Sequence, residues 1–161
     1  MNIRELNIAG MTGAYAGEIA QWRYDGIYAF YNRKDSQTEG LMDGTHYACT
    51  DAHGKLIGYF CFGDEARIPT IEENVYEADY LDVGLGLRPE LCGKGFGTAF
   101  VNLGLAYAQT HPGIDKFRLS VAAFNERAVR VYQKAGFAIV HEVTNAYFKN
   151  KFYIMTNTPP Y

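Results

Sequence analysis

Apolar and polar residues alternate along this chain with two periodicities, and each periodicity predicts a different kind of secondary structure. Segments 46–50 and 56–62 are apolar-rich and flank Asp51-Ala52-His53-Gly54-Lys55, which predicts a β-hairpin whose turn uses Gly54. Apolar residues spaced three to four positions apart predict three helices, over 12–24, 95–109 and 125–135. Further strands are predicted over 2–8, 80–87, 117–121, 137–143 and 147–155.

Residues with strong conformational preferences mark the ends of several elements. Thr12 is suited to cap the first helix, because its hydroxyl can accept a hydrogen bond from a free backbone N–H. Pro89 follows the strand over 80–87 and cannot continue its ladder, and Gly136 closes the third helix. Strands and helices alternate in the second half, so part of the sheet is expected to be parallel and the fold class is α/β or α+β.

Bulk properties predict one globular domain over residues 1–161, since 48% hydrophobic and 20% charged side chains suit a single core. The net charge of −3 argues against a basic nucleic-acid-binding stripe, and no apolar run reaches the length of a membrane span. The cysteines and histidines form neither C-x-x-C nor H-E-x-x-H, so no disulfide framework and no metal site is expected. Separated thiols and the absence of a signal-peptide pattern favour a cytoplasmic protein.

Three glycines alternate with larger residues where a strand gives way to a helix, within residues 87–98. Such a junction presents unpaired backbone N–H groups and the positive end of the helix dipole, which favours a bound anion. The P-loop pattern fails because Gly93-Lys94 is followed by Gly95, and the dinucleotide fingerprint fails because Thr98 occupies its third glycine position. For this loop alone, a glycine-rich turn with no ligand stays an alternative.

Two motifs resemble the signatures of the GNAT superfamily of acyl-CoA-dependent N-acetyltransferases. The run Cys92-Gly93-Lys94-Gly95-Phe96-Gly97 resembles its acetyl-CoA loop, Q/R-x-x-G-x-G/A, with Cys92 where the family has Gln or Arg. Leu87-Arg88-Pro89 resembles the V-x-P at the end of the family's fourth strand. Residues 121–137 match N-x-x-A-x-x-(V/L/F)-Y-x-x-x-G-F at every defined position, and together the motifs cover 80–137.

This resemblance implies both a fold and an activity. The GNAT fold is a central mixed, largely antiparallel sheet of six to seven strands, splayed between strands 4 and 5 and flanked by about four helices. Acetyl-CoA would be the acyl donor, and a small-molecule or peptide amine would attack it directly in a ternary complex. A homodimer is a further expectation, with the sheet edge near 152–155 pairing between subunits.

The resemblance also assigns roles to residues of the helix over 125–135. Asn125, Ala128 and Tyr132 share one helix face, being spaced i, i+3 and i+7. Asn125 would bind the pantetheine arm, Ala128 would leave room for it, and Tyr132 would protonate the departing thiolate. Taken alone, Asn125 equally suits a helix cap and Tyr132 an ordinary core position. The cofactor contacts implied are Leu85, Leu87, Arg88, Cys92, Gly93, Lys94, Gly95, Phe96, Gly97, Thr98, Asn125, Ala128 and Tyr132.

Because Cys92 removes a polar side chain from the phosphate site, either Arg88 or Lys94 would supply the missing donor, or affinity for the cofactor would fall. The strand over 80–87 also contains two glycines, at 84 and 86, which suit a bulge or a close backbone approach. By resemblance, the backbone around Leu85 and Leu87 would pair with the amide-bearing arm of the cofactor.

An amine that is protonated at neutral pH must lose a proton before it attacks, so a general base is needed. Family members often use an acidic residue on the fourth strand, which here gives Asp79 and Asp82, with Asp82 as the predicted base. Trp22, Tyr28 and Tyr31 are predicted to line an acceptor pocket, since ring faces attract a cation, although such rings serve equally as core.

Two functions of other classes stay open. A catalytically inactive CoA-binding or acyl-CoA-binding sensor would explain Cys92, but it leaves Tyr132 and the intact N-x-x-A face without a purpose. A nucleotide-dependent oxidoreductase would use the same glycine loop, but it conflicts with the failed dinucleotide fingerprint.

Overall fold

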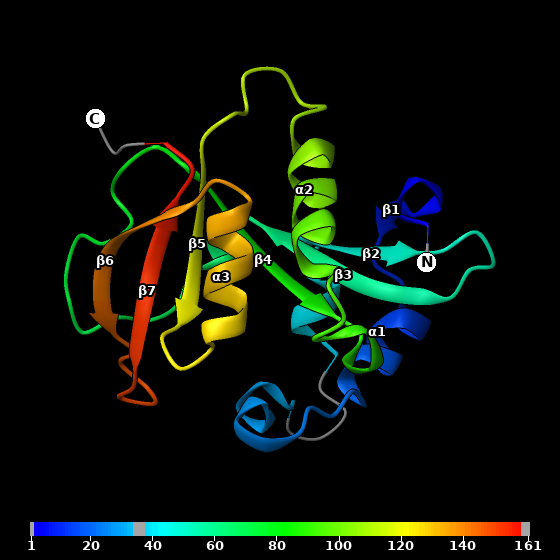
Figure 1. Ribbon diagram of the computed structural model, residues 1–161, viewed down its shortest axis with the longest axis horizontal. Coiled ribbons are helices and arrows are strands. Elements are labelled where there is room, and N and C mark those ends of the chain that lie inside the picture. The colour runs from blue at the N-terminus through cyan, green and yellow to red at the C-terminus, as the bar shows by residue number, and fades with distance from the viewer. Residues whose placement is uncertain (1, 34–37, 159–161) are drawn as a thin grey trace. The chain divides into compact units, whose positions relative to one another are not determined.

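The computed structural model describes residues 2–33 and 38–158, and Figure 1 shows the path of the chain. Its strands are β1 (Asn7–Gly10), β2 (His46–Thr50), β3 (Leu56–Phe62), β4 (Leu81–Leu87), β5 (Phe117–Ala122), β6 (Ala138–Thr144) and β7 (Lys151–Thr156). Its α-helices are α1 (Gly13–Ala20), α2 (Gly97–Ala108) and α3 (Glu126–Lys134). Short 3-10 helices lie at Ile3–Glu5, Gly26–Tyr31, Gly40–Met42, Asp64–Ala66 and Pro89–Leu91.

The seven strands are hydrogen-bonded in the order β1-β2-β3-β4-β5-β7-β6. The β4–β5 pair is parallel and aligns Leu81 with Phe117 and Val83 with Leu119, at the start of both strands, which confirms a mixed α/β sheet. Two compact units divide the chain: unit 1 holds residues up to 61 and 85–97, and unit 2 holds 62–84 and those from 98 onward. One domain over 1–161, and a splay between β4 and β5, stay predictions.

The predicted hairpin of unit 1 is confirmed, and its bounds match those of β2 and β3. Asp51 N donates to the carbonyl of Lys55 at 2.9 Å, and Gly54 adopts a left-handed conformation with φ +80°. The predicted strand over 2–8 is wrong for most of its length. The Asn2 side chain accepts a hydrogen bond from Arg4 N, which closes a 3-10 turn, and β1 begins only at Asn7.

Helix α1 begins where the sequence predicts and ends earlier. The Thr12 hydroxyl accepts from Tyr15 N at 3.2 Å, which is the predicted N-cap. The guanidinium of Arg23 donates to the carbonyls of Ala20 (3.0 Å) and Trp22 (2.8 Å), so these carbonyls are satisfied without a further helical turn. The core that α1 joins consists of Ala16, Ile19, Trp22, Leu41, Ala48 and Leu56.

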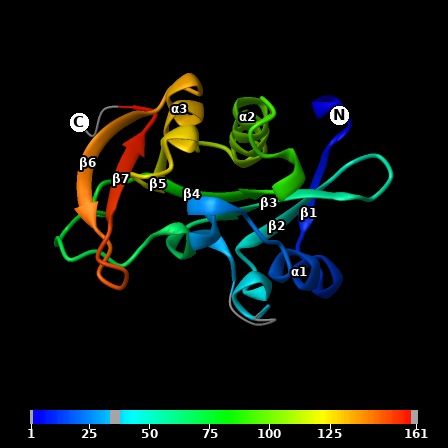
Figure 2. The ribbon, with the colours of Figure 1, turned by 60° about the horizontal axis from the view of Figure 1, so that its bottom comes forward.

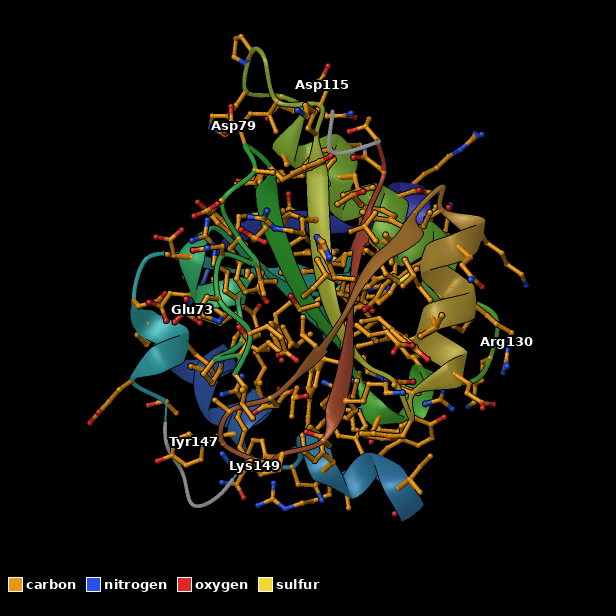
Figure 3. All side chains as sticks on the ribbon, turned by 90° about the vertical axis from the view of Figure 1, so that its left-hand side faces the viewer. Glu73, Asp79, Asp115, Arg130, Tyr147 and Lys149 are labelled. Atoms are coloured by element: carbon orange, nitrogen blue, oxygen red, sulfur yellow. The ribbon has the colours of Figure 1, made fainter. Side chains whose placement is uncertain are left out.

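In unit 2, strand β7 lies between β5 and β6 and is hydrogen-bonded to both (Figure 1). The expectation that the edge near 152–155 pairs two subunits is therefore wrong, because both edges of this strand are already used. The predicted strand over 147–155 also starts late. Asn145 Oδ1 accepts from Tyr147 N at 2.8 Å and Phe148 N at 3.0 Å, which makes a turn before β7 begins at Lys151 (Figure 3).

Helices α2 and α3 both follow the predicted pattern, and in Figure 2 they lie on the same face of the strands of unit 2. The buried positions of α2 are Phe100, Val101, Gly104 and Ala108. Helix α3 is closed by Gly136, whose φ of +99° a residue with a side chain rarely adopts. Among the described residues, no helix is both long and apolar enough to cross a membrane.

Candidate functional site

The glycine loop leaves β4 and passes through a 3-10 turn before α2 begins at Gly97. Gly93 and Gly95 adopt left-handed conformations, with φ of +71° and +87°. A Cβ added to Gly95 would meet nothing within 4 Å, and residues 93–95 are exposed. Phe96, Gly97 and Thr98, which complete the loop motif and open the helix, are half-buried. Backbone that is open in this way, at a helix N-terminus, fits a phosphate group.

Arg88 is one of the two cations predicted to replace the missing Gln or Arg side chain, and its polar groups already have partners. Its backbone N donates to Ile57 O at 2.8 Å, and its Nε donates to Leu56 O at 2.6 Å. Its guanidinium forms an ion pair with Glu18 and lies 3.6 Å from Glu90 Oε2. Arg88 therefore ties the end of β4 to β3 and α1, and the exposed Lys94 is the cation better placed for an anionic ligand.

The thiol of Cys92 turns back toward the strand that precedes it. Its Sγ lies 3.7 Å from Leu87 O and 3.6 Å from Arg88 O, within reach of weak hydrogen bonds. Leu87 O also accepts a hydrogen bond of 2.8 Å from the Tyr24 hydroxyl, and burial raises the pKa of Tyr24.

Gly86 confirms the predicted close approach on β4, and the approaching group is a side chain of unit 1. A Cβ added to Gly86 would lie 2.6 Å from Cζ and 2.8 Å from the hydroxyl oxygen of Tyr59, distances that real Cβ atoms essentially never show. The Tyr59 phenol therefore lies over the backbone of β4 and fills the space in which a side chain at position 86 would stand.

Asp82, the predicted general base, belongs to unit 2, where it is buried with 2% of its surface exposed. Its Oδ1 accepts from Arg118 Nε at 2.6 Å, and its Oδ2 accepts from Arg118 Nη2 and Arg67 Nε, both at 2.8 Å. Both oxygens are thus engaged by guanidinium groups, which favours a structural role for this carboxylate. Asp79 is exposed and precedes β4, near the end at which β4 and β5 begin (Figure 3).

Aromatic rings complete the surroundings of Arg118, which is itself 2% exposed. Its Cζ lies 4.9 Å from the ring centroid of Tyr76 and 5.5 Å from that of Tyr80. The Tyr76 hydroxyl lies 2.6 Å from Ser120 Oγ, and burial raises the pKa of Tyr76. The ion pair of Asp82 and Arg118 is therefore enclosed by packed rings and further hydrogen bonds.

The second motif forms helix α3 of unit 2. Asn125 Oδ1 accepts from Ala128 N at 3.1 Å, so this side chain caps the helix, whatever further contact it makes. Tyr132, on the same face, is 9% exposed and packs edge-on against Phe137 with ring centroids 6.5 Å apart. The parts that the resemblance assigns to Asn125, Ala128 and Tyr132 in binding and catalysis stay predictions.

The aromatic residues predicted to bind the acceptor have different surroundings within unit 1. Trp22 is 8% exposed and belongs to the core, with Arg88 Cζ 5.6 Å from its ring centroid. Tyr28 and Tyr31 lie on the 3-10 helix over 26–31, and Tyr31 is exposed. The face of Trp22 is therefore already covered by a cation of the protein itself.

Three residues near these positions were not predicted from the sequence: Arg33, Tyr59 and Arg118. For Arg118 a signal was present, because an arginine within the apolar strand 117–121 needs a partner for its charge. The other two belong to no motif, and the contact between them joins residues far apart in the sequence. Within the described part of the chain, no three side chains of the metal-ligating types gather at one place.

The family model described as the Acetyltransferase (GNAT) family matches residues 14–137, and the chain belongs to this family. The chain is 34% identical over 137 residues to spermidine N(1)-acetyltransferase of Vibrio cholerae, covering 84% of this chain and 74% of that protein. It is 32% identical over 113 residues to mycothiol acetyltransferase of Streptomyces coelicolor, covering 70% of this chain and 33% of that protein.

The match to spermidine N(1)-acetyltransferase of Escherichia coli K12 is 29% identical over 93 residues. The chain spans about half the length of that relative, because the match covers 50% of it. Among solved structures, the chain is similar to a chimera of the spermidine N-acetyltransferase SpeG from Vibrio cholerae and hSSAT. The TM-score is 0.70 with 20% identity, over 94% of each chain, which shows a shared fold.

Proposed function

We propose that the protein is an N-acetyltransferase that moves an acetyl group from acetyl-CoA to a primary amine, within a ternary complex. The observation that carries the proposal is the open glycine loop, with Gly93 and Gly95 left-handed and exposed, in a chain of the GNAT family. The thioester of acetyl-CoA supplies the activated acetyl group.

The proposed cofactor contacts divide into two groups. The backbone N–H groups of 93–98 bind the pyrophosphate, with Lys94 supplying positive charge. Arg88, Cys92 and Phe96 hold the loop in shape, as the contacts of Arg88 and Cys92 support. The backbone of Leu85 and Leu87 in unit 1 is proposed to bind the amide-bearing arm. Asn125 and Ala128 in unit 2 are proposed as arm contacts on the strength of their own motif.

Tyr132 is proposed as the general acid that gives its phenolic proton to the departing thiolate. A phenol suits this task, because it stays protonated at neutral pH and its hydroxyl is directional. Tyr132→Phe removes the proton and keeps the ring that packs against Phe137. The variant is expected to bind acetyl-CoA as the wild type does, with kcat lowered by about a hundredfold or more.

Asp82 stays the predicted base, and its two guanidinium partners supply a way to test that role. If Asp82 takes a proton from the amine, Asp82→Asn lowers kcat by about a hundredfold or more while the protein stays folded. If the carboxylate only balances Arg118, the same variant loses stability and the folded fraction keeps the wild-type kcat.

The first experiment is calorimetric titration with acetyl-CoA, with NADH and ATP as controls for the alternative uses of a glycine loop. Gly95→Ala is expected to weaken acetyl-CoA binding, because its φ of +87° is strained for alanine and a methyl group would stand in the open loop. Gly113→Ala is the matched control, since Gly113 has a φ of +84° and equally open space. Equal loss in both variants would point to strain alone and count against the loop.

Saturable binding of acetyl-CoA justifies an amine screen that follows release of free CoA. Spermidine is the acceptor named for the relatives from Escherichia coli and Vibrio cholerae, so it enters the screen first. Binding without turnover of any amine, and with no change on Tyr132→Phe, would favour the sensor over the enzyme.

A further inference from the structure

Unit 1 contains a half-buried guanidinium, that of Arg33, which has no acidic partner among the described residues. Arg33 Cζ lies 5.9 Å from the ring centroid of Tyr59. Arg33 is partly buried and makes no ion pair with any residue in 2–33 or 38–158. A positive charge that is partly removed from water and lacks a counter-charge is a place where an anion gains free energy by binding.

Three acidic side chains of unit 1, those of Glu18, Asp43 and Glu90, have basic partners of their own. The exposed Asp25 and Glu39 make no ion pair with any described residue, Arg33 included. Glu18 pairs with Arg88, and Glu90 Oε2 lies 3.6 Å from Nη1 of the same arginine. Asp43 Oδ1 lies 3.0 Å from His46 Nδ1, and the His46 ring packs 6.2 Å from that of Tyr59. These carboxylates therefore offer Arg33 no counter-charge.

Two further hydrogen-bond donors, one on Tyr59 and one on the neighbouring Trp22, also have no partner among the described residues. The Tyr59 hydroxyl makes no hydrogen bond to the described residues, although it is only partly buried. Trp22 Nε1 is buried and likewise has no partner among them, and its ring lies 6.3 Å from that of Tyr59. We call Trp22, Arg33 and Tyr59 the Arg33 cluster. Its unsatisfied groups are N–H and O–H donors, a combination that suits an acceptor-rich anion.

The Arg33 cluster lies next to the part of β4 that is proposed to hold the acyl end of the cofactor. The Tyr59 hydroxyl lies over Gly86, between Leu85 and Leu87, whose backbone is proposed to hold the acyl arm. A group bound by Tyr59 would thus stand beside the segment of β4 where the amine must attack. In an α-amino acid the amine and the carboxylate are joined through one carbon atom, so both would fit within this short span.

We propose that the Arg33 cluster binds the carboxylate of the acyl acceptor, so that the preferred acceptor is an amine that carries a carboxylate, such as an amino acid. This inference rests on the proposed acetyltransferase function. The guanidinium of Arg33 and the phenol of Tyr59 donate to the carboxylate oxygens. A polyamine would bring further positive charge beside Arg33, which repels it.

The test compares matched amines as acetyl acceptors for the full 161-residue chain. Release of free CoA is followed with the twenty common L-amino acids, their methyl esters and spermidine, for wild type, Arg33→Gln and Arg33→Lys. For the best amino acid, wild-type kcat/KM should exceed that of its ester by about ten- to a hundredfold, the worth of one charge-assisted hydrogen bond. Arg33→Gln should bring the two within about threefold, with Arg33→Lys in between.

Arg4→Gln is the control, since Arg4 is exposed in the same unit and its removal should leave the preference for the acid unchanged. The inference is overturned if the wild type prefers spermidine or the esters, or if Arg33→Gln keeps the wild-type ratio. If acetyl-CoA binds and no amine is acetylated, the proposed function fails. Binding of the same amino acids, measured by saturation-transfer NMR, then decides: weaker binding by Arg33→Gln supports the carboxylate site, and equal binding refutes it.

Discussion

Arg118 and Arg33 both lie against tyrosine rings, and their surroundings differ in one respect. In unit 2, Arg118 has the Asp82 carboxylate at hydrogen-bonding distance, and Arg67 completes the coverage of that carboxylate. In unit 1, Arg33 lies over Tyr59 and has no carboxylate partner among the described residues. We call the first cluster closed, because its charges are paired within the chain. We call the second, the Arg33 cluster, open, because its guanidinium has no carboxylate partner among the described residues.

The contrast separates charges that hold the fold from charges that can bind a ligand. A buried ion pair whose donors and acceptors are satisfied within the chain offers a ligand nothing, and removing one partner leaves an uncompensated charge. A partly buried cation without a partner contributes little to stability and keeps its hydrogen-bonding capacity for another molecule. The comparison therefore predicts opposite responses of the two clusters to the same kind of substitution.

The largest effect is expected from Arg118→Met. Removing this guanidinium leaves Asp82 buried with only Arg67 beside it, so the free energy of unfolding should fall by about 3–5 kcal/mol. The matched variant Arg33→Met should change it by no more than about 0.5 kcal/mol, as is usual where no buried interaction is lost. Urea unfolding followed by circular dichroism measures both. Similar losses in the two variants would show that the open cluster is as structural as the closed one.

A middle-sized effect is expected from Gly86→Val, which tests the contact that places Tyr59, a member of the open cluster, over β4. The new side chain would enter the space of the Tyr59 phenol, and the overlap should cost about 1–3 kcal/mol of unfolding free energy. In a Tyr59→Ala background the same substitution should cost clearly less, because the phenol is gone. A double-mutant cycle measures this coupling, and a coupling of zero would mean that the phenol moves aside without penalty.

The smallest effect is expected from Tyr24→Phe, which removes the hydrogen bond to Leu87 O and should cost about 1 kcal/mol. The variant should also change the dependence of stability on pH. Burial raises the pKa of Tyr24 above its ordinary value of 10.0, so its contribution is fully present below pH 10 and is lost as the pH rises above that value.

Between about pH 9 and 11, wild type should therefore lose more stability than Tyr24→Phe, because only the wild type carries this phenol. Tyr147→Phe is the control, since Tyr147 is 82% exposed and its removal should leave the pH dependence of the wild type unchanged. Unfolding in urea at fixed pH values gives the comparison. Parallel curves for wild type and Tyr24→Phe would rule out a stabilising contribution from the protonated Tyr24.

The elements that the sequence predicted well are those with local signals. The hairpin over 46–62 carries its own turn glycine, and α3 carries both its cap and its closing glycine, so neighbouring residues suffice to define them. The prediction of a strand over 2–8 was wrong because the side chain of Asn2 closes a turn. Apolar periodicity carries no information about such a side-chain hydrogen bond. The edge expected at 152–155 failed because strand order is decided by pairing at long range.

The same distinction holds for the candidate site. The glycine loop and Tyr132 could be found because each lies in a motif whose spacing is itself informative. The partners of Asp82 and the neighbours of Tyr59 could not, since Arg118 and Gly86 are brought there by strand pairing rather than by sequence distance. Arg33 has no motif at all, and its lack of a partner becomes visible only when its surroundings are known.

Gly86 also provides a way to reshape the surface of β4. Since the Tyr59 phenol occupies the volume above Gly86, residue 59 controls how much room stands over that stretch of β4. Smaller residues at 59 would enlarge the space without altering the β4 backbone. A library of substitutions at this one position is therefore an economical starting point for engineering the protein to accept bulkier molecules.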